Sequence, residues 1–234
     1  LNHYDSILRF DEYFKINNTL KSFVIFRHDV DRHPYRALKM AELENELGVK
    51  STYYFRMKPN IFLPEIILKI SRLGHEIGYH YECLSDARGD VGKALKEFKY
   101  NLKKIRKIVP VDTISMHGRP FNKHDNRDMW KVQKNNKMLK KDLKILGEVY
   151  LDIDYSDIAY INDTGRNWQS NKSNLRDKIT SNISSDFSNN NELLAALNQK
   201  RYEKIIFQIH PERWNDNYLL WINQYLFDSA VNFV

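Results

Sequence analysis

The sequence predicts an α/β protein whose strands form a closed or nearly closed seven-stranded (β/α) barrel, similar to a TIM barrel. β-prone segments alternate with helical patterns along the chain, which favours a mainly parallel sheet with right-handed helical crossovers. Seven candidate strands occur within 234 residues, and no Pro-, Gly- or Ser-rich linker divides them. A doubly wound open sheet is the alternative, but the first strand is not followed by the glycine-rich phosphate turn typical of that fold. We therefore expect a single domain over residues 1–234.

The individual elements follow from local patterns. Residues 1–20 carry apolar side chains at loosely helical spacing, which predicts a helical cover at one end of the domain. The expected strands are the run from Phe23 to the pair Asp29 and Asp31, and residues 51–55, 76–82, 113–116, 148–153, 158–161 and 204–209. The expected helices run from Pro34 to Gly48 and from Pro64 to Gly74, over 91–109 and 192–198, and around Leu219–Phe227 at the end of the chain.

Residues 118–147 show no clear period and are long for a plain loop. Connections of this length within a domain usually have a function of their own. This segment therefore predicts a lid or an insertion.

The net charge of +7 would suit an anionic partner. The lysines, however, are spread along the chain, and their densest stretch, residues 131–144, lacks the interleaved aromatic residues of a strand-binding groove. We therefore expect no nucleic-acid partner. No apolar run approaches the ~20 residues that a membrane helix needs, so no transmembrane segment is predicted.

The cysteine content bears on the compartment. Cys83 is the only cysteine, which excludes an internal disulfide. The first residues also lack the basic start and apolar stretch of a secretory signal peptide. A reducing, cytoplasmic setting fits these features best.

The first long strand ends in two carboxylates. Alternate residues of an extended chain face the same way, so Asp29 and Asp31 point to one side while Val30 points to the other. Two carboxylates in one small space repel each other unless a cation lies between them or one stays protonated, which is typical of metal and catalytic sites. The alternative is a strand that runs into a polar loop with an Asp helix cap.

Other strands also end in ionisable residues. In a (β/α) barrel the carboxyl ends of the strands meet at one face, where catalytic groups gather. These ends read Arg56, then His80 and Glu82, then His117, then Asp152 and Asp154, then Asp163, and finally His210.

Four segments resemble motifs of the polysaccharide deacetylase superfamily, also called the NodB-homology fold, within residues 22–212. They are His-Asp-Val-Asp at 28–31, Gly-His-Glu-Ile-Gly-Tyr-His at 74–80, Leu-Asp-Ile-Asp-Tyr-Ser-Asp at 151–157 and Ile-Phe-Gln-Ile-His-Pro at 206–211. The resemblance implies an irregular seven-stranded (β/α) barrel. It also implies removal of an acyl group, typically acetyl, from the nitrogen of a sugar.

The resemblance also implies roles for four residues. Asp29 is expected to be the general base, Asp31 and His80 ligands of a divalent metal ion, and His210 the acid that protonates the departing amine. Zn is the expected ion, and a mixed carboxylate and imidazole shell suits Co, Ni, Mn or Fe as well.

The chain departs from the family pattern at two places. Leu84 stands where the second motif normally has another metal-binding histidine, so the third ligand is expected to be His117, with Glu82 as the alternative. The third motif is replaced by Ser-Met-His-Gly-Arg-Pro at 115–120. Arg119 of this segment, or Arg56, is expected to bind a carboxylate or phosphate of the substrate.

Together these features predict a metal-dependent hydrolase that removes an N-acyl group from a sugar or glycan precursor in surface polysaccharide biosynthesis. The expected partners are an acylated sugar, a sugar nucleotide or a lipid-linked glycan. The alternative function is a non-catalytic carbohydrate-binding or assembly protein on the same barrel, without a metal, which Leu84 in place of a ligand would allow.

Overall fold

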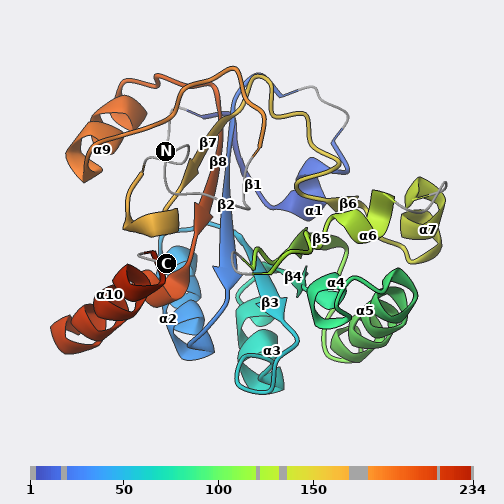
Figure 1. Cartoon of the computed structure of the whole chain (residues 1–234). Helices are drawn as coiled ribbons and strands as arrows, with labels where there is room; N and C mark the ends of the chain where they lie inside the picture. The colour runs from blue at the N-terminus through green and yellow to red at the C-terminus, as the bar shows by residue number, and fades with distance from the viewer. Residues whose placement is uncertain are drawn as a thin grey trace.

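The computed structural model shows a curled parallel sheet surrounded by helices (Figure 1). It describes residues 4–16, 20–119, 122–131, 136–168, 179–214 and 217–232. The strands are β1 (Ser6–Leu8), β2 (Phe23–Val30), β3 (Thr52–Arg56), β4 (Glu76–Tyr81), β5 (Thr113–Met116), β6 (Gly147–Glu148), β7 (Ala159–Asn162) and β8 (Lys204–Ile209).

Seven of these strands follow one path, in the order β6-β5-β4-β3-β2-β8-β7, and β1 joins β2 beside it. Every ladder between these strands is parallel. Within the described residues no ladder joins β6 to β7, so the barrel is open between these two strands. The predicted α/β barrel of seven parallel strands is confirmed, and its sheet is a half-barrel.

The helices connect successive strands and cover the outside of the sheet (Figure 1). α2 and α3 begin with the predicted prolines and are followed by Gly48 and Gly74, whose φ angles of +71° and +91° favour glycine. Asp90 caps α5 by accepting a hydrogen bond from Lys93 N. The α-helices are α1 (Phe10–Tyr13), α2 (Pro34–Glu46), α3 (Pro64–Arg72), α4 (Cys83–Asp86), α5 (Val91–Ile105), α6 (Asp128–Lys131), α7 (Asn136–Asp142), α9 (Asn190–Asn198) and α10 (Tyr218–Asn232), and the 3-10 turns are η1 (Thr164–Arg166) and η2 (Pro211–Arg213). No helix in the described part of the chain is both long and apolar enough to span a lipid bilayer.

The helix expected over residues 1–20 is wrong in its first part. Ser6–Leu8 form β1, which pairs with the first residues of β2, and among the described residues of this segment only Phe10–Tyr13 are helical. β3 pairs with the same edge of β2 only from Arg27 onward, so the start of that edge is left for β1. Pairing with this edge therefore overrides the loosely helical spacing of the apolar residues.

The strand expected over residues 148–153 is also wrong beyond Glu148. The buried carboxylate of Glu148 accepts hydrogen bonds from the backbone N–H groups of Tyr150 and Leu151, both at 2.8 Å. It also accepts one from Met116 N at 3.0 Å. These bonds fold the chain into a turn directly after β6.

Part of the predicted insertion, residues 118–147, packs into the core. Trp130 of α6 is fully buried, and its ring lies edge-on to Tyr81 and Phe98. Residues 120–121 and 132–135 of the segment lie outside the described residues. A lid function for this segment stays a prediction.

Candidate metal and catalytic site

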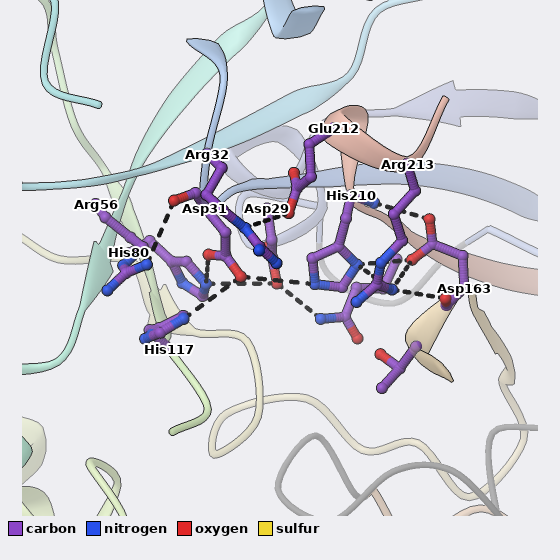
Figure 2. A network of polar contacts seen from close by, with 12 residues as sticks. Asp29, Asp31, Arg32, Arg56, His80, His117, Asp163, His210, Glu212 and Arg213 are labelled. Carbon is purple, nitrogen blue, oxygen red and sulfur yellow. Dashed lines mark hydrogen bonds and ion pairs between the residues drawn. The ribbon is translucent and has the colours of Figure 1, made fainter. Parts of the chain in front are cut away.

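Asp29 and Asp31 lie at the carboxyl end of β2, which has β3 on one edge and β8 on the other. Both carboxylates approach the same nitrogen, Nε2 of His80, at 3.6 Å and 3.4 Å. Figure 2 shows them in one polar network with His117 and His210. The structure therefore brings together the five residues for which the sequence predicts metal binding or catalysis.

Asp31, His80 and His117 form a compact group of possible metal ligands. One carboxylate oxygen and one ring nitrogen from each histidine lie within 4.8 Å of one another. His80 of β4 and His117 after β5 come from neighbouring strands, since β4 pairs with β5 and His117 N donates to Tyr81 O at 2.8 Å, while Asp31 follows β2, which β3 separates from β4. The β4–β5 pairing thus explains why a residue so distant in sequence can replace a ligand of the second motif.

The ring orientations fit a metal ion. Nδ1 of His80 is 3.0 Å from Ser115 O, so Nδ1 carries the proton and Nε2 presents its lone pair to the site. Nε2 of His80 and Nε2 of His117 are each 3.4 Å from an oxygen of Asp31. Ligand atoms bound at ~2.0 Å to a tetrahedral ion lie about 3.3 Å apart. The spacing and the donor types therefore suit a divalent transition metal.

Glu82, the alternative third ligand, is bound by an arginine and is not part of this group. Arg56 donates two parallel hydrogen bonds to its carboxylate, both at 2.9 Å. Oε2 of Glu82 is also 3.3 Å from Nδ1 of His117. Burial would raise the pKa of Glu82, but the hydrogen bond and charge of His117, together with Arg56 and Lys58, lower it to about 2. The geometry favours His117 as the third ligand, with the ionised Glu82 beside its other ring nitrogen.

A pair of variants separates these roles. We expect His117→Ala to release most of the metal, because one of three protein ligands is lost. We expect Glu82→Gln to keep the ion and weaken its binding by about 10- to 100-fold, the usual effect of losing a partner of a ligand. Competition with a chelator of known affinity measures both. If His117→Ala retained the metal as well as Glu82→Gln does, His117 would be excluded as a ligand.

His210, after β8, is held by Asp163, after β7. Nδ1 of His210 is 2.6 Å from Oδ1 of Asp163, and its Nε2 lies 4.0 Å from Asp31 (Figure 2). Asp163 also accepts hydrogen bonds from Arg213 Nη1 at 2.8 Å and Trp214 Nε1 at 3.0 Å. Burial and Arg213 lower the pKa of His210, but Asp163 and Asp31 outweigh them and raise it to about 9. The imidazole is therefore a proton donor whose Nε2 faces the site.

Asp163→Asn tests this pairing through the pKa of His210. The wild-type pKa of about 9 lies above the ordinary value of 6.5, so the pair stabilises the fold below pH 6.5 and this contribution is lost as the pH rises through 9. In the variant, the Asp163 carboxylate is gone while burial, Arg213 and Asp31 remain, so we expect the pKa to fall well below 9. NMR titration of the His210 ring in metal-free protein measures it. An unchanged pKa would contradict the pairing.

Asp29 is held by Arg27, two residues earlier on the same face of β2. Arg27 Nε and Nη2 donate to the two carboxylate oxygens at 2.8 Å and 2.7 Å, and Gln208 Nε2 donates to Oδ2 at 2.7 Å. Burial would raise the pKa of Asp29, but the charge of Arg27 outweighs it and the pKa lies below its usual value. The rings of Tyr54 and Tyr150 flank the buried guanidinium. Asp29 is therefore an ionised carboxylate with a fixed orientation.

The two arginines expected to bind substrate are both engaged by carboxylates. Arg56 donates both of its parallel hydrogen bonds to Glu82, as described above. Nη1 of Arg119 donates to Asp86 at 2.8 Å and lies 3.8 Å from Glu82. Pro120, the other residue of this motif, lies outside the described residues. A substrate contact of either arginine stays a prediction.

No protein-family model and no curated protein matches the sequence. Solved structures, however, match its fold. A structure from Mycobacterium smegmatis described as a polysaccharide deacetylase matches with a TM-score of 0.52 at 15% identity, covering 93% of this chain and 86% of that one. The fold is that of the polysaccharide deacetylases.

Two further solved structures are less similar. Peptidoglycan deacetylase PdaC from Bacillus subtilis has a TM-score of 0.47 at 13% identity, covering 91% of this chain and 84% of that one. A CE4 family pseudoenzyme from Bacillus anthracis has a TM-score of 0.46 at 13% identity, covering 90% and 61% of the two chains. At these identities the likeness is one of fold, and the roles of the residues depend on the geometry.

Leu84, which stands where the polysaccharide deacetylase motif has a histidine, lies in α4 and is buried in the hydrophobic core. Its side chain belongs to the same cluster as Tyr81 and Phe98. The departure from the motif is thus filled by packing, and His117, after the next strand, places an imidazole beside Asp31 and His80.

The fourth-motif resemblance at 151–157 does not lie at the site. Asp157 pairs with Lys204, the first residue of β8, at 2.5 Å, and Asp152 accepts a hydrogen bond from Glu148 N at 2.7 Å. These acids therefore lie toward the amino ends of the strands, beside Phe23 and Lys204, and the expectation that Asp152 and Asp154 lie at the face where the catalytic groups gather is wrong. The carboxylate that binds His210 is instead Asp163.

Three groups of the site were not assigned from sequence, namely Asp163 as the partner of His210, Arg27 as the partner of Asp29, and Trp214. Asp163 ends the strand that pairs with the His210 strand, and Arg27 lies two residues before Asp29. Both positions could be read from strand periodicity and strand order. Trp214 carries no such signal.

Proposed function

We propose that the protein is a metal-dependent hydrolase that removes an N-acyl group, typically acetyl, from a sugar. The observation that carries this proposal is the arrangement of Asp31, His80 and His117 at metal-ligand spacing, with an ionised Asp29 and a protonated His210 beside them. This set combines an ion site, a base and an acid, which amide hydrolysis requires. The deacetylase fold agrees with the same chemistry.

The ion would be held by Asp31, His80 and His117. When bound, it polarises the amide carbonyl and lowers the pKa of water at the site. Zn is the expected ion, and the donor set also suits Co, Ni, Mn or Fe.

The residues of the chain then carry the protons. Asp29, ionised and fixed by Arg27, accepts a proton from the attacking water while the oxygen of that water bonds to the acyl carbon. Nε2 of His210 donates its proton to the sugar nitrogen as the C–N bond breaks, while Nδ1 stays bound to Asp163. The products are a carboxylic acid and the free amino sugar.

The proposed substrates are an acylated sugar, a sugar nucleotide or a lipid-linked glycan of surface polysaccharide biosynthesis. The cytoplasmic location expected from the cysteine content is part of the same proposal. All of these substrates present the acylated sugar nitrogen that the site would attack.

Protein purified without a chelator provides the test. A stoichiometric transition metal and release of acetate from N-acetylated oligosaccharides or sugar nucleotides would support the proposal. Absence of metal, together with saccharide binding and no acetate release, would support the non-catalytic alternative.

A further inference from the structure

A cavity of about 500 Å³ lies directly beside the site, with Asp31 in its wall. It is formed by the segment that follows β2, the start of α2 and the segment between β3 and α3. Cationic side chains line it together with apolar ones. The residues used below are Arg32, Tyr35, Arg56 and Lys58.

The cationic groups around this cavity outnumber the carboxylates that they contact on the β3–β4 side. Lys58 Nζ is 2.6 Å from Asp86 and 3.4 Å from Glu82. Arg56 contacts Glu82 at 2.9 Å, and Arg119 contacts Asp86 at 2.8 Å. The wall of the cavity itself has three cationic side chains, those of Arg32, Arg56 and Lys58, and one carboxylate, that of Asp31. The Arg56 fork is taken up by Glu82, whereas the side chain of Lys58 is 36% exposed.

Arg32 follows Asp31 directly in the chain. Its side chain is 34% exposed, and its Nε is 3.7 Å from Glu212. It also lines the cavity, as Lys58 does. Figure 2 shows Arg32 next to Asp31 in the network. An anion in the cavity could thus meet a guanidinium from the segment after β2 and an ammonium from the segment after β3.

The start of α2 adds to this field. The helix has 13 residues and begins at Pro34, with Tyr35 in the cavity wall. No side chain caps it, and its first turn has no acidic residue. The partial positive charge of the helix N-terminus is therefore not neutralised by the residues of its own first turn, and it favours an anion at this wall.

We propose that this cavity binds an oxyanion of the substrate, a phosphate or a carboxylate, through Arg32 and Lys58. This inference rests on the proposed function and narrows its substrate class to sugars that carry a negative charge close to the acylated nitrogen. Guanidinium and ammonium groups form charge-assisted hydrogen bonds with either oxyanion.

The test is binding to metal-free protein, because an ion at the triad would itself attract phosphate. Three probes are compared by calorimetry, namely UDP-N-acetylglucosamine with a diphosphate, a hyaluronan tetrasaccharide with carboxylates, and neutral chitotetraose. We expect at least one anionic probe to bind about tenfold or more tightly than chitotetraose, since one charge-assisted hydrogen bond contributes that much. The probe that binds distinguishes a phosphate from a carboxylate.

Variants then locate the binding. Lys58→Met and Arg32→Gln are each expected to weaken the anionic probe about tenfold or more. Lys93→Met, which removes a lysine of α5 whose side chain is 77% exposed, is expected to change nothing. Equal binding of all three probes, no binding of either anionic probe, or full binding by folded Lys58→Met and Arg32→Gln proteins would overturn the inference.

The same experiments keep this inference apart from the proposed function. Metal-dependent release of acetate from chitotetraose with no preference for anions would overturn the anion site alone. Anion binding that depends on Lys58 and Arg32, without acetate release from any probe by the metal-loaded protein, would overturn the hydrolase.

Discussion

Asp31→Ala and His80→Ala are each expected to lose the bound metal, with binding weakened by well over ~100-fold. Losing a ligand should cost more than the 10- to 100-fold typical of losing a ligand's hydrogen-bond partner. The remaining atoms could not close the coordination shell, because His80 and His117 each lie 3.4 Å from the carboxylate of Asp31 and share it. Metal content after dialysis against a weak chelator measures the loss.

Asp154→Ala is the matched control for these variants. Its carboxylate is exposed and accepts a hydrogen bond from Ser156 N, away from the strand ends that carry the site. We expect it to keep the full complement of metal. Full occupancy in Asp31→Ala and His80→Ala as well would show that the ion binds elsewhere.

His210→Ala is expected to keep the metal and lose turnover on an N-acetylated sugar by ~100-fold or more, the usual contribution of a positioned proton donor. The amine must be protonated as it leaves, and Nε2 of His210 is the nitrogen that faces the site. An activated aryl ester has a leaving group that needs no proton, so the loss should shrink on that substrate. Steady-state rates on both substrates measure the difference.

Thermal unfolding of the same variant serves as the control. His210 precedes Pro211 and accepts the backbone N–H of Arg213 on its carbonyl oxygen, so it could also brace η2. A purely structural role would lower the melting temperature and reduce both activities equally. Equal losses on amide and ester would therefore contradict the general-acid assignment.

Most of the fold could be predicted from sequence because the strands of a parallel sheet are short apolar runs between amphipathic helices. The errors lie where local pattern competes with sheet pairing. The sequence of β1 resembles part of a helix, yet its residues pair with the start of the β2 edge, which β3 leaves unpaired. Residues 149–153 read as a strand, yet the buried carboxylate of Glu148 accepts hydrogen bonds from the N–H groups of Tyr150 and Leu151 and folds the segment into a turn.

The site could be predicted in part because the side-chain period of a strand is two. That period places Asp29 and Asp31 together on one face of the strand. It also places Arg27 on that face beside Asp29, so the partner of Asp29 could have been predicted as well. The choice between His117 and Glu82 depended on the β4–β5 pairing and on the fork of Arg56, which periodicity does not specify.

The partner of His210 shows a different limit. The Asp-x-Asp spacing at 151–157 resembles a motif, but a turn separates it from the carboxyl ends of the strands. Asp163 is a single acid without a motif around it. It lies at the site because β7 pairs with β8 in register, with Asn162 opposite Gln208.

The central claim is that Asp31, His80 and His117 hold a metal ion, and a crystal of the protein grown with cobalt tests it directly. We predict one strong anomalous peak within ~2.1 Å of the Asp31 carboxylate and of Nε2 of both His80 and His117. An anomalous map with no peak among these three residues, or with its peak bound by other side chains, would contradict the claim.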